Sequence, residues 1–265
     1  MIVNINLVGG EKQMKIGIIG AMPEEVDLIK GYMQITEIQE VGMKDFIIGK
    51  LNNKDIILVY SRCGKVASAS TVTILIERYN VNMVIFTGVA GAADEQLNVG
   101  DIVIADRLIQ HDMDASAIEY FEKFEIPLLK KTFFDVDESS INLSKLAISR
   151  YVEQDLKNEI RKDLIDEFNL SNPKVLVGTI ASGDQFIADK DKLKQLKSQI
   201  SNLKCVEMEG AAVAQVCYEY KIPYIVVRVV SDKADEFAKM NFPKFVQETA
   251  SFLTCGIVRK LLEII

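Results

Sequence analysis

Several residue types and patterns are scarce in this 265-residue chain, and each scarcity excludes a class of protein. A single histidine, His111, excludes a metal site built from several imidazole ligands. The four cysteines are scattered and form no Cys-x-x-Cys pair, so we expect buried, reduced thiols rather than a disulfide framework. No block of lysine or arginine stands out and the net charge is −7, which argues against nucleic acid as a partner.

Long apolar runs and targeting signals are also missing. No segment reaches the ~18 consecutive apolar residues of a membrane span, so we expect no membrane partner. The start of the chain has no basic segment, and Glu11-Lys12-Gln13 stands where a signal peptide would carry small residues. We therefore expect a cytoplasmic protein. Met14 is an equally good start, so residues 1–13 are expected to be a disordered extension. No repeat or Pro/Gly-rich linker divides residues 14–265, which predicts one domain.

What the chain does contain is a regular alternation of two patterns. Short apolar runs predict strands at Lys15–Gly20, Asp45–Leu51, Asp55–Tyr60, Met83–Thr87, Asp101–Ala105, Lys174–Ile180, Cys205–Glu207 and Tyr224–Val230. Helical spacing of apolar residues predicts helices at Pro23–Met33, Gly64–Tyr79, Lys190–Gln199, Glu209–Tyr220 and Pro243–Leu262. Such alternation is typical of an α/β protein with a mixed sheet covered by helices on both faces.

The least regular segment is expected at Ala117–Ser140. It is unusually apolar for a loop, with seven large residues: Phe121, Phe124, Ile126, Leu128, Leu129, Phe133 and Phe134. A loop this long and apolar is not expected to be solvated on all sides. It either packs as a lid or meets a second subunit.

Three short motifs have a structural and a functional interpretation. Gly17-Ile18-Ile19-Gly20 lacks the full dinucleotide-binding fingerprint, so a tight strand-to-helix turn is favoured. Gly88-Val89-Ala90-Gly91 is similar, although its glycines would let the backbone approach a ligand closely. His111-Asp112-Met113-Asp114 resembles a set of metal ligands. Without another histidine or a suitably spaced acid, a hydrogen-bonded loop cluster is favoured.

Acidic residues follow three of the predicted strands. Glu24 and Glu25 come after the first strand, Glu207 and Glu209 after a later one, and Asp232 after the last. Each acid alone is explained by a favourable position at a helix N-terminus. Together they lie at strand ends, which is where α/β proteins place ligands. With the polar Ser182-Gly183-Asp184 run, they predict one site for acid/base chemistry on a small molecule.

Seven motifs occur in an order that resembles a known enzyme family. They are Met14–Val26 (MKIGIIGAMPEEV), Ser61–Ala67 (SRCGKVA), Thr87–Gly91 (TGVAG), Val99–Ala105 (VGDIVIA), Ser182–Ile187 (SGDQFI), Val206–Gly210 (VEMEG) and Arg228–Asp235 (RVVSDKAD). Together they resemble the 5′-methylthioadenosine/S-adenosylhomocysteine nucleosidases of the nucleoside phosphorylase/hydrolase superfamily. The resemblance implies a three-layer α/β/α sandwich with a mixed, partly barrel-like central sheet, a homodimer, and no metal or other cofactor.

The resemblance also implies an activity and a set of site residues. The activity is hydrolysis of the N-glycosidic bond of both nucleosides, which releases adenine and a thioribose. Asp232, oriented by Ser231, would protonate N7 of adenine, Glu25 would position water, and Glu209 would bind the ribose hydroxyls. The substrate-binding set is completed by Val89, Ala90 and Gly91 near the ribose and water, Phe186 and Ile187 on adenine, Met208 against the sugar, Glu207 beside it, and Phe242 in the pocket wall. Burial and neighbouring acids should raise the pKa of Asp232 so that it is protonated near neutral pH.

Two departures from the family pattern leave the 5′-substituent preference open. Arg62 stands where a small residue is usual, and Ile118 replaces an aromatic residue that in the family faces the partner's 5′ pocket. Methylthio, homocysteinyl, deoxy and futalosine-type nucleosides all remain candidates. The chief rival activity is a nucleoside phosphorylase, with Arg62 as the one residue that suggests a phosphate site. A nucleoside-binding regulatory domain is the second rival, but binding alone does not require Glu25 to position water.

Overall fold

Ten strands form one mixed sheet in the computed structural model, which describes residues 14–234 and 245–265. The expected extension at residues 1–13 lies outside the described residues. The strands are β1 (Lys15–Gly20), β2 (Gln34–Val41), β3 (Lys44–Leu51), β4 (Lys54–Tyr60), β5 (Met83–Ala92), β6 (Ile102–Gln110), β7 (Phe134–Asp135), β8 (Val175–Ser182), β9 (Leu203–Glu207) and β10 (Tyr224–Asp232).

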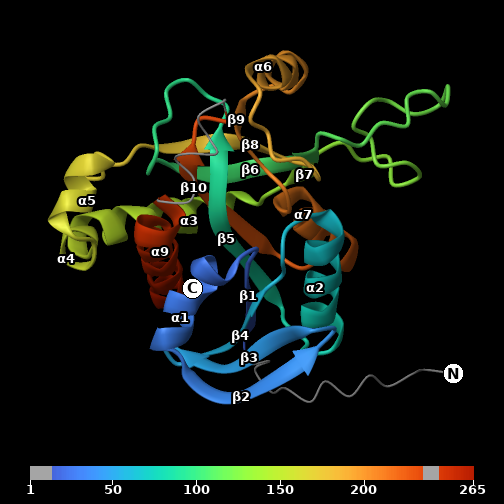
Figure 1. The fold of residues 1–265 in the computed structure, drawn as a ribbon. Coiled ribbons are helices and arrows are strands. Elements are labelled where there is room, and N and C mark those ends of the chain that lie inside the picture. Colours follow the sequence, from blue (N-terminus) through green and yellow to red (C-terminus); the bar gives the residue numbers. More distant parts are fainter. Residues whose placement is uncertain (1–13, 235–244) are drawn as a thin grey trace, which may run out of the picture.

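Part of this sheet closes on itself. Strand β5 pairs with both β9 and β10, which completes the ring β5-β10-β6-β8-β9. From β5 the sheet continues outward through β1, β4, β3 and β2, and the last two strands curve beneath the other elements in Figure 1. Parallel pairs such as β1–β5 and β5–β10 occur beside antiparallel pairs such as β6–β10. The sheet is therefore mixed and partly barrel-like, as predicted.

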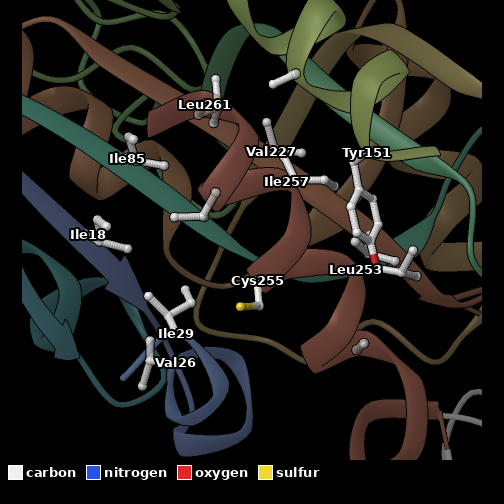
Figure 2. Packing of buried hydrophobic residues seen from close by; sticks show 14 of the residues in the cluster. Ile18, Val26, Ile29, Ile85, Tyr151, Val227, Leu253, Cys255, Ile257 and Leu261 are labelled. Carbon is white, nitrogen blue, oxygen red and sulfur yellow. The ribbon is translucent and has the colours of Figure 1, made fainter. Parts of the chain in front are cut away.

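Helices cover one face of the sheet through a large apolar cluster. Helices α1 (Pro23–Tyr32), α3 (Glu138–Gln154) and α9 (Ser251–Ile264) contribute to it. Figure 2 shows the labelled members of this cluster: Ile18, Val26, Ile29, Ile85, Tyr151, Val227, Leu253, Cys255, Ile257 and Leu261. The two helices α3 and α9 come close because Gly256 has no side chain, and a Cβ there would lie 1.9 Å from the Tyr151 ring. Burying one such aliphatic side chain stabilises the fold by about 1.5–3 kcal/mol.

The opposite face is covered by α2 (Lys65–Glu77) and α7 (Gly210–Tyr220). Alternate residues of a strand point to opposite faces, so in β5 Ile85 joins the first cluster while Val84 and Phe86 join the second. Both faces of these strands are buried, and their sequences are therefore continuous apolar runs. The three-layer α/β/α arrangement is confirmed.

The remaining elements include several that the pattern did not predict. These are β2, β7, α3, α4 (Leu156–Glu159) and α5 (Lys162–Glu167). Helix α6 (Lys190–Gln199) has the predicted bounds. The predicted helix Pro243–Leu262 begins outside the described residues and contains a π-helical turn at Val246–Ala250 before α9. Gly17–Gly20 lies within β1, and the predicted tight strand-to-helix turn follows at once, with only Ala21 and Met22 between β1 and α1.

The segment predicted to be irregular ends earlier than expected, because α3 already begins at Glu138. Its preceding part has few regular pairings and reaches away from the sheet in Figure 1. Phe124, Ile126 and Phe134 are buried, whereas Tyr120 and Leu128 are 86% and 88% exposed. Among the described residues, none forms a helix long and apolar enough to cross a membrane.

Candidate active site

A cavity of about 250 Å³ lies where several strands end. Four of its lining residues are acids, and the rest are mainly apolar or small. The described residues that line it are Ala21, Met22, Glu25, Cys63, Val89, Ala90, Gly91, Gln185, Phe186, Ile187, Val206, Glu207, Met208, Glu209, Ser231 and Asp232. All predicted site residues within the described ranges line this cavity. Phe242 lies outside the described residues.

Strand register brings these segments to one place. Gly91 of β5 is paired with Asp232 of β10 on one side and with Val206 of β9 on the other. Ser182 at the end of β8 is paired with Glu207 at the end of β9. Strand β1 runs parallel to β5 and delivers the chain to Glu25 in the first turn of α1. The acids far apart in the sequence therefore share one edge of the sheet, as the strand-end argument predicted.

Glu25 is held by three backbone N–H groups. Its Oε2 accepts from Ala21 at 2.5 Å and from Met22 at 3.0 Å, and its Oε1 accepts from Val89 at 3.0 Å. The same Glu25 carboxylate thus accepts hydrogen bonds from the N-terminal end of α1 and lines the cavity. Burial raises its pKa, while the Arg228 charge and these hydrogen bonds oppose the rise. Gly88 leaves the necessary space, because a Cβ there would lie 2.5 Å from Glu25 Oε1.

Glu207 forms a buried ion pair that the sequence pattern did not predict. Arg228 is 1% exposed, and its Nη2 donates to Glu207 Oε2 at 2.6 Å. The Ser182 hydroxyl and the backbone N–H groups of Glu209 and Gly210 also donate to the Glu207 carboxylate. The Arg228 guanidinium lies 4.0 Å from the centre of the Phe86 ring. These contacts occupy Glu207 with protein partners, although it lines the cavity.

Glu209 is the N-cap residue of α7 and is 5% exposed. Its Oε1 accepts a hydrogen bond from the Gly64 backbone N–H at 2.7 Å. Burial and the nearby Glu207 charge raise its pKa to about 8. The Gly64 contact joins the turn before α2 to the acidic end of β9, two segments 145 residues apart.

Asp232 closes β10 and is 2% exposed. The Ser231 hydroxyl donates to its Oδ2 at 2.8 Å, and the Ala234 N–H donates to its Oδ1 at 2.8 Å. Gly91 lies against it, since a Cβ at this position would lie only 3.0 Å from Oδ1. The predicted contact between Ser231 and Asp232 is present.

The apolar wall of the cavity has an open side. Phe186 is 47% exposed, whereas Ile187, Val89 and Ala90 are buried. Phe186 and Ile187 follow β8, and Met208 lies between the two acids that follow β9. A flat aromatic ring at the mouth and aliphatic side chains within suit a planar heterocycle joined to a polar sugar.

Several residues at the cavity were not predicted, among them the lining residues Ala21, Met22, Gln185 and Val206. Two others, Arg228 and Cys63, carry polar or reactive groups. Arg228 could have been found, because a charged residue inside the apolar run Tyr224–Val230 must be paired if that strand is buried. Cys63 lines the cavity and is exposed, so the prediction of four buried thiols was wrong at this position. Partial burial and nearby acids, Glu209 foremost, raise the Cys63 pKa, which leaves it a thiol rather than a reactive thiolate.

The His111–Asp114 run is a hydrogen-bonded loop cluster, as favoured. Asp112 accepts from the Lys65 ammonium at 2.6 Å and from the Asp184 N–H at 2.8 Å. His111 is 4% exposed and packs against Gly183. Its two ring nitrogens have no hydrogen-bond partner among the described residues.

Comparison with known proteins identifies the family. The family model described as the Phosphorylase superfamily matches residues 15–263. A 5′-methylthioadenosine/S-adenosylhomocysteine nucleosidase from Bacillus cytotoxicus is 36% identical over 251 residues, covering 95% of this chain and all of the relative. This chain belongs to the family of those nucleosidases. 

Solved structures agree with this assignment. An S-adenosylhomocysteine nucleosidase from Streptococcus pyogenes, in complex with 5-methylthiotubericidin, has a TM-score of 0.82 and 36% identity over 96% of this chain and 98% of that one. A futalosine hydrolase of Helicobacter pylori has a TM-score of 0.81 and 33% identity over 97% and 100%. This chain is thus similar in structure to enzymes named for two different nucleosides, S-adenosylhomocysteine and futalosine.

Proposed function

We propose that this protein hydrolyses the N-glycosidic bond of 5′-methylthioadenosine and S-adenosylhomocysteine and releases adenine. The observation that carries the proposal is the convergence of Glu25, Glu209 and Asp232 from three separate strand ends on one buried cavity. Cleavage of such a bond passes through an oxocarbenium-like sugar while negative charge moves onto the purine. The reaction needs an acid at the leaving group and a carboxylate that orients water on the opposite face of the sugar.

Asp232 is the proposed acid. Its hydrogen bonds from Ser231 and Ala234 fix the carboxyl group beside Gly91 in the wall of the cavity. Protonated Asp232 would deliver its proton to N7 of adenine as the glycosidic bond breaks. A well-placed general acid accelerates a reaction about 10²–10⁴-fold.

Glu25 is the proposed water-positioning carboxylate. Three backbone donors fix its orientation, and the buried Arg228 charge nearby favours its ionised form against the cost of burial. Arg228 is in turn held by Glu207. We therefore assign Glu207 to positioning Arg228 rather than to the direct substrate contact first expected of it.

Glu209 is proposed to bind the ribose hydroxyls. One carboxyl oxygen accepts from the Gly64 N–H, which fixes the orientation of the group in the cavity wall. The raised pKa of Glu209 favours its protonated form, whose hydroxyl can donate a hydrogen bond. A group that can donate or accept a hydrogen bond suits hydroxyls whose contacts strengthen as the sugar becomes cationic.

The rival phosphorylase activity is disfavoured by charge. The described residues that line the cavity include four acids but no lysine or arginine. A phosphate nucleophile requires cationic donors and would be repelled by Glu25. Arg62, the residue that suggested a phosphate site, does not line this cavity. A binding module without turnover is disfavoured because it gains nothing from the buried carboxylate Glu25, which is costly to desolvate.

We further propose a cytoplasmic homodimer that acts in methionine salvage. The free cysteines suit a reducing compartment. Tyr120, Leu128 and the 54%-exposed Ile118 supply apolar surface for a second subunit. None of residues 117–140 lines the cavity of the described chain, so a lid formed by the same chain has no support. In the homodimer this segment would approach the 5′ end of the partner's substrate.

The test is release of adenine by the purified protein. Methylthioadenosine and adenosylhomocysteine are each incubated with it, and free adenine and the thioribose product are separated by chromatography. The proposal requires turnover of both nucleosides. Tight binding of either nucleoside without adenine release would instead favour the regulatory-domain alternative.

A further inference from the structure

Cys63 lines a second hollow besides the cavity. This second hollow is an open groove of about 440 Å³ on the surface, and Lys44, Arg62 and Asp184 also line it. The Cys63–Gly64 turn borders the Glu209 end of the cavity, because the Gly64 N–H donates to Glu209. A nucleoside with its purine at Asp232 and its ribose at Glu209 would therefore direct a long substituent past Cys63 into the groove.

Arg62 presents an unpaired guanidinium to this groove. Its Nη2 donates to the Met43 carbonyl at 2.6 Å, and among the described residues this is the only hydrogen bond of the Arg62 side chain. The Arg62 carbonyl accepts from the Ser61 hydroxyl. No described carboxylate forms an ion pair with the Arg62 guanidinium. Its backbone has φ 71°, in the left-handed region that favours glycine. A strained backbone conformation at the rim of a site is a reason to look for a function of the side chain.

Lys44 adds a second positive charge to the same groove. It is 7% exposed, and within the described part of the chain its ammonium donates only to the neutral Ala67 carbonyl at 3.2 Å and Ser70 hydroxyl at 3.0 Å. Burial and the Arg62 charge lower its pKa. Two neighbouring cations without a described carboxylate partner favour binding of an anion. Asp184 contributes one negative charge to the groove lining, with its Oδ1 bonded to the Lys65 N–H at 2.8 Å.

We propose that this groove is a subsite for a carboxylate at the far end of the 5′-substituent, with Arg62 as the specificity-determining residue. The guanidinium fork matches a carboxylate, and Asp184 offers a partner for an ammonium group. The zwitterionic homocysteinyl group therefore fits the groove with both charges, and an aryl carboxylate fits its cationic part. The neutral methylthio group ends before it. This inference rests on the proposed nucleosidase activity.

The experiment compares kcat/KM for three nucleosides: methylthioadenosine, adenosylhomocysteine and futalosine. The variant is Arg62→Gln, and Arg161→Gln serves as the control because it removes the same charge from an exposed arginine at the N-cap of α5. We expect Arg62→Gln to lower kcat/KM at least tenfold for the carboxylate-bearing nucleosides that the wild type cleaves, and less than twofold for methylthioadenosine. High salt should lower kcat/KM for the charged substrates and leave kcat/KM for methylthioadenosine unchanged. Arg62→Gly, which suits the left-handed backbone, should give the same selectivity change.

Three outcomes separate the possibilities. Selective loss on adenosylhomocysteine or futalosine supports the subsite, and the pair of substrates shows whether the ammonium contributes. An equal loss on all nucleosides, or no loss on any, overturns it. Failure of the wild type to release adenine from methylthioadenosine would defeat the proposed activity itself, which is a different result from an unchanged selectivity ratio.

Discussion

At the scale of single residues, the site depends on carboxylates that are buried and yet individually supported. Glu25 accepts three backbone hydrogen bonds, Asp232 accepts from Ser231 and Ala234, and Glu207 is paired with Arg228. A buried charge without such partners would cost several kcal/mol. The same contacts fix each carboxylate in one orientation, which a catalytic group requires.

The proposed acid gives the first prediction. Asp232→Asn should lower the rate of adenine release about 10²–10⁴-fold, because the amide keeps the shape of the side chain but delivers no proton to N7. Steady-state kinetics with methylthioadenosine measure the loss, and circular dichroism checks that the fold is retained. More than a tenth of wild-type turnover would remove Asp232 from the general-acid role.

Glu25 is predicted to act on water rather than on the nucleoside. Glu25→Gln should reduce kcat at least about 100-fold, since the neutral amide orients and activates water poorly. Nucleoside affinity, measured by calorimetry, should change less than about fivefold, a difference of ~1 kcal/mol. A loss of affinity as large as the loss of rate would reassign Glu25 to substrate binding.

At the scale of elements, the parallel strands could be predicted because burial on both faces leaves continuous apolar runs. β1 has the predicted bounds, and β10 extends two residues beyond the prediction to include Ser231 and Asp232. β2 gives no such signal, since none of its residues is buried and a bulge between Ile35 and Glu37 breaks its alternation. α3 was missed although Asp137 caps it by accepting from the Ser140 N–H, because its apolar face follows directly on the irregular segment.

The site itself could be predicted in part. Acids that directly follow strands were informative, because the sheet edge collects them whatever their separation in sequence. Strand β5 closes the barrel by pairing with β9 and β10, and no local sequence pattern indicates these pairings. The pairing of Gly91 with both Val206 and Asp232 could therefore not be predicted from the spacing of residues. The Arg228–Glu207 pair depends on that same closure. The roles assigned to the individual residues remain predictions.

The stability of the protein is predicted to depend on pH through His111, which lies where the ends of β6 and β8 meet. His111 follows β6 and packs on Gly183 after β8, and burial lowers its pKa below 6.5, with Lys192 adding to the effect and Asp112 and Glu207 opposing it. The unfolded chain therefore binds the proton more tightly. Stability from this residue is complete above pH 6.5 and is lost as the pH falls further.

Thermal unfolding of wild type and His111→Leu between pH 5 and 8 measures this effect. The wild type should lose more Tm than the variant between pH 7 and pH 5, because only the wild type has to protonate a buried imidazole. The raised pKa values of Glu25 and Glu209 act in the opposite direction but are common to both proteins. Parallel pH profiles would show that His111 is not the titrating group.

At the scale of the whole molecule, the protein combines a well-packed three-layer body with an exposed apolar segment that includes Ile118, Tyr120 and Leu128. The large buried clusters hold the strand ends that carry the acids, whereas Tyr120 and Leu128 lie on surface that the described chain leaves uncovered. That one domain spans residues 14–265 remains a prediction, supported by the continuous sheet.

We predict a homodimer, because Ile118, Tyr120 and Leu128 expose apolar surface that a second subunit could cover. Light scattering at micromolar concentration should give twice the mass of the 29.7 kDa chain. Tyr120→Asp should shift the protein toward monomer, because a charge in an apolar interface is costly to desolvate. Tyr32→Asp on α1, also exposed, is the matched control and should leave the dimer unchanged. A fully active wild-type monomer would contradict this prediction.

The central claim is that water, and not phosphate, attacks the sugar in a cavity lined by acids. Product analysis of methylthioadenosine turnover in phosphate-free buffer and in buffer with added phosphate tests it most directly. We expect the same rate in both buffers, with free methylthioribose and adenine as the products. Methylthioribose 1-phosphate among the products, or a rate that rises steeply with phosphate, would contradict it.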